Sequence, residues 1–153
     1  MGSGRRSCAE RGENGQDCAG EGREAPMNIS RPALTEPRRG EIWFVKIPTD
    51  PAEKQARPVV VVSMDARNTH PRAETILGVP LSTALRDLPT HIRVQPGESG
   101  LGETCDIQAE NISTIRKQSL VTSRLPLKRL SEGKLRQIAR AVVIAMQFTP
   151  EGL

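Results

Sequence analysis

The chain has 153 residues, of which 26% are charged and 36% are hydrophobic, and its formal net charge is +4. This length fits one domain with a proper core and is too short for two domains of ordinary size. The modest positive charge allows a polyanionic partner. Because Trp43, Phe44 and Phe148 are the only aromatic residues, we exclude the base-stacking platform that many single-strand binders use.

Residues 1–26 differ in composition from everything that follows. They contain six glycines and nine charged residues but no Leu, Ile, Val, Phe or Trp. Such a segment buries too little apolar surface to fold, so we expect residues 1–37 to be a disordered extension, with Met27 as the hypothetical native start. We expect a single folded domain over residues 38–148, followed by a short tail over 149–153.

From Gly40 onward, short apolar stretches alternate with turn signals, which is typical of β-strands. Residues 58–63 form a continuous β-branched run, so we expect that strand to be buried on both faces. Residues 90–95 alternate, with His91, Arg93 and Gln95 on an exposed side. Pro80 should end the pairing of its strand or mark an edge. The predicted strands are 41–47, 58–63, 75–82, 90–95, 105–109 and 112–115, with a turn cluster at 95–100.

The carboxyl-terminal part changes to a helical period. Apolar residues recur at helical spacing from Leu135 to Met146, and Ser131 is a plausible N-cap. The pattern predicts one amphipathic helix over 131–148 that packs on the sheet. The fold class is therefore mainly β with a C-terminal helix, built as a strongly bent antiparallel sheet or small barrel.

The composition also limits the chemistry. There is no glycine-rich nucleotide loop, and the chain has only two histidines, so we predict neither a metal site nor a cofactor. The sequence also lacks a recognisable arrangement of carboxylate, histidine and activated serine, so we do not predict a serine-type catalytic triad. The three cysteines lack the spacing of a disulfide framework or a zinc site, and no apolar run is long enough to cross a membrane, so we expect a cytoplasmic protein with free thiols.

Arg57 stands out, because it lies where a polar loop enters an apolar strand. A fork-shaped, permanently charged donor at a strand edge is well suited to gripping a phosphate. The alternative is a surface arginine paired with Glu53.

Several segments, in order, resemble the MazF/PemK/Kid family of toxin endoribonucleases from toxin–antitoxin pairs, from about residue 38 to 148. They are R-G-E-I-W at 39–43, E-K-Q-A-R-P-V at 53–59, V-P-L-S-T at 79–83, L-P-T-H at 88–91 and E-N-I-S-T-I at 110–115. The resemblance implies an SH3-like (CcdB/PemK-like) fold, usually a homodimer, that cuts single-stranded RNA without metal by using the RNA 2′-hydroxyl. It also implies a cognate antitoxin protein as partner.

The resemblance assigns catalytic roles to Arg57, Ser82 and Glu110. Arg57 matches the catalytic arginine, which stabilises charge on the phosphoryl group. Ser82 lies where the family usually has a threonine and keeps the hydroxyl, although Thr83, one residue later, is an alternative. Glu110 matches an acidic position used in proton transfer or base contacts, the alternative being an ordinary turn carboxylate. The identity of the general base stays open.

The same resemblance gives five candidate RNA contacts. His91, otherwise an unremarkable surface histidine, belongs to the L-P-T-H segment, and Gln108 stands where one subgroup has arginine. Ala52 replaces a histidine of some members, which predicts a distinct RNA preference. The five candidates are Gln55, Thr83, His91, Gln108 and Asn111.

Two other functions are open at this point. CcdB toxins share the fold but bind DNA gyrase and cut no RNA, so the fold alone cannot separate the two activities. A catalytically silent RNA-binding relative is the second alternative, given serine in place of threonine at residue 82.

Overall fold

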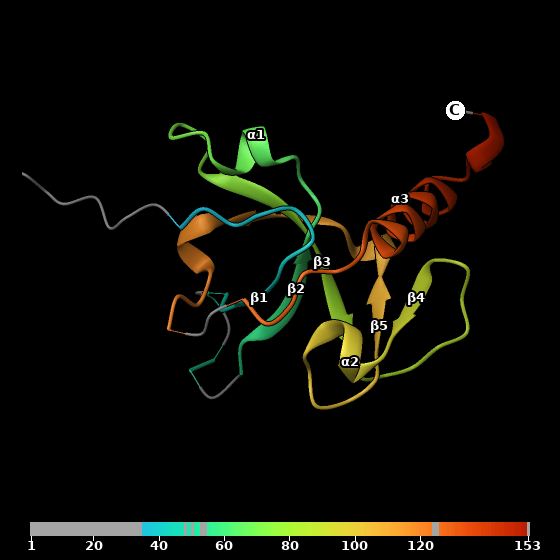
Figure 1. The fold of residues 1–153 in the computed structure, drawn as a ribbon, viewed down its shortest axis with the longest axis horizontal. Helices are drawn as coiled ribbons and strands as arrows, with labels where there is room; N and C mark the ends of the chain where they lie inside the picture. The colour runs from blue at the N-terminus through green and yellow to red at the C-terminus, as the bar shows by residue number, and fades with distance from the viewer. Residues whose placement is uncertain (1–34, 48, 50, 53–54, 124–125, 153) are drawn as a thin grey trace, which may run out of the picture. The chain divides into compact units, whose positions relative to one another are not determined.

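The computed structural model describes residues 35–47, 49, 51–52, 55–123 and 126–152. The expected extension and the hypothetical start at Met27 lie almost wholly outside these residues. Within the described part, six strands form one antiparallel sheet in the order β1-β2-β3-β5-β4, with β6 also paired to β3 (Figure 1). The strands are β1 (Ile42–Val45), β2 (Arg57–Val61), β3 (Thr75–Ser82), β4 (His91–Val94), β5 (Cys105–Gln108) and β6 (Ser113–Arg116).

Strand β3 is the centre of the sheet, and its bounds are those predicted. One edge pairs with β2, from Val59 opposite Pro80 to Val61 opposite Gly78. Along the other edge, β6 pairs with residues 75–78 and β5 pairs with residues 81–82. Strands β5 and β6 therefore lie end to end along the same edge of β3. The 3₁₀ turn η1 (Ala109–Asn111) separates them.

Pro80 lies inside β3 rather than at its end, and the interruption at η1 explains how the sheet accommodates it. The carbonyl of Leu77 accepts from the amide of Val62 in the segment after β2. Odd-numbered residues of β3 thus direct their polar groups toward β2, and even-numbered residues direct theirs toward β5 and β6. The missing N–H of Pro80 consequently falls where β6 has ended its pairing and β5 has not begun, which costs the ladder nothing.

The sheet is strongly bent, and the chain after β6 follows the free edge of β1. Isolated bridges join Val45 to Leu120 and Glu41 to Arg129. The face of the sheet that carries Trp43 and Val59 holds an inner apolar cluster. Its members are Trp43, Val45, Val59, Val61, Ile76 and Leu120, with Ile115 packed against them. The predicted burial of the second strand on both faces is confirmed, because Val60 and Val61 are 0% exposed on opposite faces.

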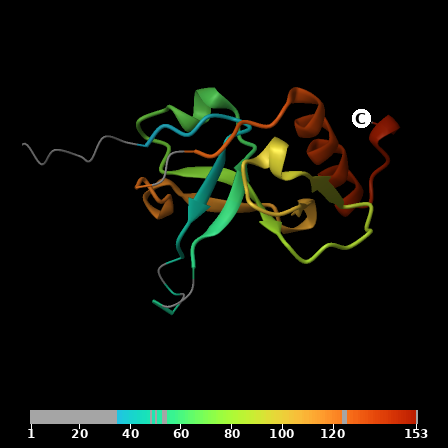
Figure 2. The ribbon, with the colours of Figure 1, turned by 60° about the horizontal axis from the view of Figure 1, so that its bottom comes forward.

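Helix α3 (Glu132–Ala145) covers the other face, beside β4 and β5 (Figures 1 and 2). Its N-cap is Ser131, as predicted, and the Ser131 side chain accepts from the amide of Lys134. The helix ends earlier than the predicted residue 148, because Gln147 adopts a left-handed φ of 64° that stops the helical path. Its buried face packs into the larger apolar cluster through Leu135, Ile138 and Ala141.

Short helical turns complete the described chain. The predicted turn cluster at 95–100 contains the one-turn helix α2 (Pro96–Ser99), which Gly100 ends at a φ of 78°. The other turns are α1 (Asp65–Asn68), η2 (Lys117–Ser119) and η3 (Pro150–Gly152). The predicted fold class, mainly antiparallel β with a C-terminal helix, is confirmed.

Candidate functional site

One face of the sheet brings the predicted catalytic arginine and serine toward each other. Because side chains alternate along a strand, Arg57 and Val59 of β2 share a face, as do Pro80 and Ser82 of β3. Val59 pairs with Pro80. Extending that register by two residues beyond the ladder brings Arg57 opposite Ser82. These two candidate positions therefore belong to adjacent strands and to one face.

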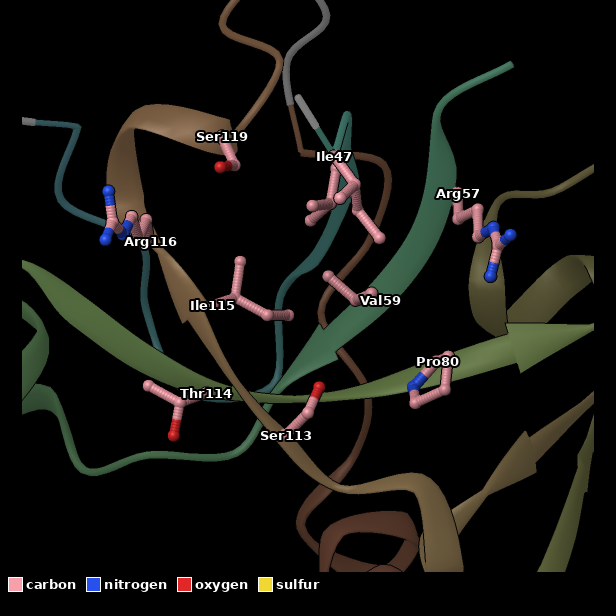
Figure 3. Close-up of a pocket in the computed structure, with 10 residues that line it drawn as sticks. Ile47, Arg57, Val59, Pro80, Ser113, Thr114, Ile115, Arg116 and Ser119 are labelled. Carbon is pink, nitrogen blue, oxygen red and sulfur yellow. The ribbon is translucent and has the colours of Figure 1, made fainter. Parts of the chain in front are cut away.

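A pocket of about 350 Å³ lies on this face, at one end of the inner apolar cluster. Figure 3 shows Arg57 and Pro80 on one side of the pocket and Arg116 and Ser119 on the other. The floor is apolar and the rim carries cations and hydroxyls, an arrangement that suits a ligand with an apolar or planar part and an anionic group. The lining residues are Val45, Ile47, Arg57, Val59, Pro80, Ser113, Thr114, Ile115, Arg116 and Ser119.

The same face continues across β5 and β4 with polar side chains. Ser82 pairs with Asp106 in the β3–β5 ladder. Asp106 in turn pairs with Arg93, and Gln108 pairs with His91, in the β5–β4 ladder. Since each strand alternates, these five side chains share the face that carries Arg57. The apolar pocket is thus continued along one side of the sheet by polar side chains, of which Asp106 and His91 are buried.

Ser82 and Thr83 differ in their setting. The hydroxyl oxygen of Ser82 accepts from the amide of Ala84 at 3.2 Å, and Ser82 is half-buried as the last residue of β3. A hydroxyl that accepts one hydrogen bond still has its own proton to donate. Thr83 is exposed and follows the strand. The geometry therefore favours Ser82 over Thr83 as the hydroxyl next to Arg57.

Glu110 lies in η1, between β5 and β6, and its carboxylate accepts a hydrogen bond from a ring nitrogen of His91. Partial burial raises the pKa of Glu110, but hydrogen bonds from its own amide, from His91 and from Thr90 outweigh this and hold the pKa below its usual range. The contact with His91 holds the Glu110 carboxylate in a defined position, and its catalytic role stays a prediction.

The remaining RNA-contact candidates are spread over this region. Gln108 accepts from the side-chain amide of Asn111 at 3.1 Å, so these two residues form one polar unit beside Glu110. Gln55 is exposed in the loop before β2. Glu53, the proposed alternative partner of Arg57, lies outside the described residues.

His91 corrects one expectation. The predicted alternation of residues 90–95 holds for Arg93 and Gln95, which are exposed. The His91 side chain, however, is only 3% exposed, so it is not the surface histidine that the pattern predicted. Two carboxylates, those of Glu110 and Asp106, lie beside the ring. A contact between His91 and RNA stays a prediction, and Glu110 stands between the ring and the open face.

The sequence reading did not pick out Asp106 or the second rim of the pocket. Asp106 is the only charged residue in the predicted strand 105–109, and its side chain is 1% exposed. A single acid within a predicted strand could have indicated a functional or structural role, because a buried carboxylate is stable only with charged or hydrogen-bonding partners. Arg116 and Ser119 carried no such signal, since their place on the rim depends on how β6 and η2 wrap past β1.

A family model for "PemK-like, MazF-like toxin of type II toxin-antitoxin system" matches residues 38–146 of the chain. The chain belongs to this family. The "Probable endoribonuclease MazF5" of Mycobacterium tuberculosis is 30% identical to this MazF-like toxin over 110 residues, which cover 72% of this chain and 93% of the relative. The enzyme class predicted from the sequence, a toxin endoribonuclease, is confirmed.

Solved structures of similar proteins agree. An endoribonuclease from mycobacterial species is 25% identical to this MazF-like toxin, with a TM-score of 0.59, over 76% of this chain and 96% of that chain. Another mycobacterial endoribonuclease, solved with its cognate antitoxin, is 26% identical with a TM-score of 0.57, over 72% of this chain and 95% of that chain. A MazE–MazF structure from Deinococcus radiodurans, at 16% identity and a TM-score of 0.60 over 74% of this chain and 99% of that chain, shares the fold. These comparisons support the endoribonuclease reading rather than the gyrase-binding alternative.

The described residues offer neither a metal-ion site nor a membrane-spanning helix. They contain no group of three or more His, Cys, Asp or Glu side chains arranged to hold a metal ion. Nor does the described part of the chain include a helix of the length and apolarity needed to cross a bilayer.

Proposed function

We propose that this toxin cleaves single-stranded RNA, mRNA included, at preferred sequences and without a metal ion, and that the reaction occurs on the face that carries Arg57. The observation that carries the proposal is that Arg57 lines the pocket and shares a sheet face with Pro80 and Ser82 of the neighbouring strand β3. A guanidinium and a hydroxyl on one face supply two donors for the phosphoryl oxygens of a scissile phosphate. The apolar floor offers a place for a flanking base.

In the proposed reaction, the RNA 2′-oxygen forms a bond to the adjacent phosphorus while the bond from phosphorus to the 5′-oxygen breaks. The 2′-hydroxyl proton passes to a base, for which the charged Glu110 carboxylate is the candidate. The leaving 5′-oxygen takes a proton from water at this exposed rim. Arg57 stabilises the extra negative charge on the phosphoryl oxygens, and Ser82 donates its hydroxyl proton to one of them.

We also propose that the toxin works in the cytoplasm as a homodimer and is neutralised by a small cognate antitoxin. Support comes from the family and from the mycobacterial endoribonuclease solved with its cognate antitoxin. An acidic segment of such an antitoxin laid over the cationic rim would block RNA from the pocket.

The test is a matched pair of arginine variants from opposite sides of the pocket. Arg57→Ala should lower kcat for a long RNA, assayed in EDTA, by about 100-fold or more, as loss of a transition-state donor does. Arg116→Ala should keep kcat within a few-fold, because it removes an equal charge from the far rim. Full kcat in Arg57→Ala would refute the assignment. Binding without cleavage by the unaltered protein would instead identify a silent RNA-binding relative.

A further inference from the structure

Three ionisable side chains form a line behind the open face, from β5 through β4 to η1. The Nε2 atom of His91 is 2.8 Å from Oε1 of Glu110, and its Nδ1 atom is 3.5 Å from Oδ2 of Asp106. The His91 and Asp106 side chains are 3% and 1% exposed, whereas that of Glu110 is 35% exposed. The line therefore starts in the interior and ends at the surface where RNA is proposed to bind.

Asp106 is fixed in place by groups other than His91. Its carboxylate accepts from the backbone amide of Arg86 at 2.7 Å and from the Arg93 guanidinium at 3.0 and 3.3 Å. Burial raises the pKa of Asp106, but these hydrogen bonds outweigh it and keep the pKa below its usual range. Asp106 is thus an anchored negative charge that is too deeply buried to touch a substrate.

His91 is held between that charge and Glu110. A hydrogen bond to the charged Glu110 carboxylate requires a proton on Nε2, because a carboxylate only accepts. Nδ1 is buried without a hydrogen-bond partner among the described residues, and it faces the Asp106 carboxylate. The ring is therefore held from both sides, with Nε2 against Glu110 and Nδ1 against Asp106, and these two contacts fix its orientation.

We propose that Asp106 and His91 are positioning residues for this toxin: Asp106 orients the His91 ring, and the ring holds the Glu110 carboxylate in place at the edge of the proposed RNA-binding face. The inference rests on the proposed function in one respect, namely that Glu110 acts on RNA as a carboxylate. The arrangement itself exists without RNA. It can therefore be tested separately from catalysis.

The first experiment uses ¹⁵N-histidine NMR on the full chain, which has only two histidines. His70 is exposed and serves as an internal reference. We expect a proton on Nε2 of His91 in the unaltered protein, and a clear change of the His91 ring signals in Asp106→Asn. The control is Asp87→Asn, because Asp87 also pairs with Arg93 at 3.2 Å but is 95% exposed on the surface. It should leave the His91 signals unchanged.

The second experiment compares two replacements of His91 by pH–rate profiles of RNA cleavage. An asparagine amide occupies about the place of Nδ1 and a glutamine amide about that of Nε2, so only His91→Gln keeps a donor for Glu110. His91→Asn should lower kcat/KM by about 10- to 100-fold, as misplacement of a reacting group does, and His91→Gln by less. Because the lost donor raises the pKa of Glu110, the acid limb should move to higher pH in His91→Asn.

The charged groups around the His91 ring all influence the pH dependence of the cleavage rate. They are Asp106 on β5, Glu110 on η1 and Arg93 on β4, and Arg140 of α3 lines the hollow beside His91. A merely structural role of His91 would lower the rate equally at every pH. Such parallel profiles, equal losses in both His91 variants, or unchanged His91 signals in Asp106→Asn would each overturn the inference. If the His91 signals change in Asp106→Asn as expected but the unaltered protein cuts no RNA, the proposed function is wrong, while the positioning of His91 by Asp106 is supported.

Discussion

Truncation of Ile138 tests how much the packing of α3 against the sheet contributes to the free energy of unfolding. Ile138 is 2% exposed and belongs to the larger apolar cluster. Ile138→Ala removes three carbon atoms, which at about 0.8 kcal/mol each gives roughly 2.4 kcal/mol from transfer alone. The cavity left behind adds to this, so we expect a total loss of about 3–4 kcal/mol in the free energy of unfolding.

Ile144 of the same helix provides the matched control. Ile144→Ala removes the same three atoms from a residue that is 36% exposed. The gain in helix propensity is similar for both substitutions and cancels in the comparison. We expect a loss of about 1 kcal/mol for Ile144→Ala, because little cavity forms at a partly exposed site. The two variants should thus differ by at least about 2 kcal/mol.

Urea denaturation followed by the fluorescence of the single tryptophan, Trp43, measures this difference. With an m-value of about 1.5 kcal/mol per M, the midpoints should lie more than about 1 M apart. Protein concentration must be equal in all samples, since the proposed self-association would make the apparent stability depend on concentration. Equal losses in Ile138→Ala and Ile144→Ala would refute the packing of α3 described above.

Two further substitutions test the buried carboxylate and the helix cap. Since Arg93 and the amide of Arg86 keep the pKa of Asp106 low, charged Asp106 stabilises the fold above about pH 4 and this stabilisation is lost in acid. The difference in Tm between the unaltered protein and Asp106→Asn should therefore be largest at neutral pH and narrow as the pH falls; a constant difference contradicts this. Ser131→Ala should cost about 1 kcal/mol in thermal unfolding, because it removes the acceptor for the Lys134 amide, and Ser131→Asp should restore it.

The strands and the helix were predictable because their signals are local. Residues 75–82 are mostly apolar and begin and end with hydroxyl-bearing residues, and β3 has the same bounds in the structure. The C-terminal limit of α3 was not predictable, because residues 146–148 continue the apolar pattern while Gln147 takes a left-handed backbone. A pattern of side chains carries no information about such a reversal.

The site was predictable only where a motif carried it. Arg57 and Ser82 came from the family segments, and the register supports their proximity. The burial of His91 was not foreseeable, because alternation places it on the same side as exposed Arg93, and a pattern of side chains does not show which of the two the folded chain buries. The partners of Asp106 likewise come from β4 and from a loop backbone, two places that only the folded chain brings together.

The three-residue turn η1 changes which side chains the neighbouring strands present to the site. Before it, even-numbered residues such as Asp106 pair with even-numbered residues of β3. After it, odd-numbered residues such as Ser113 and Ile115 take those places, and both line the pocket. The residues that lie on the pocket face of the sheet therefore change from even-numbered to odd-numbered within η1. Variation in the length of this turn is tolerable only in steps of two, since a single added or lost residue would turn the lining of the pocket to the opposite face of the sheet.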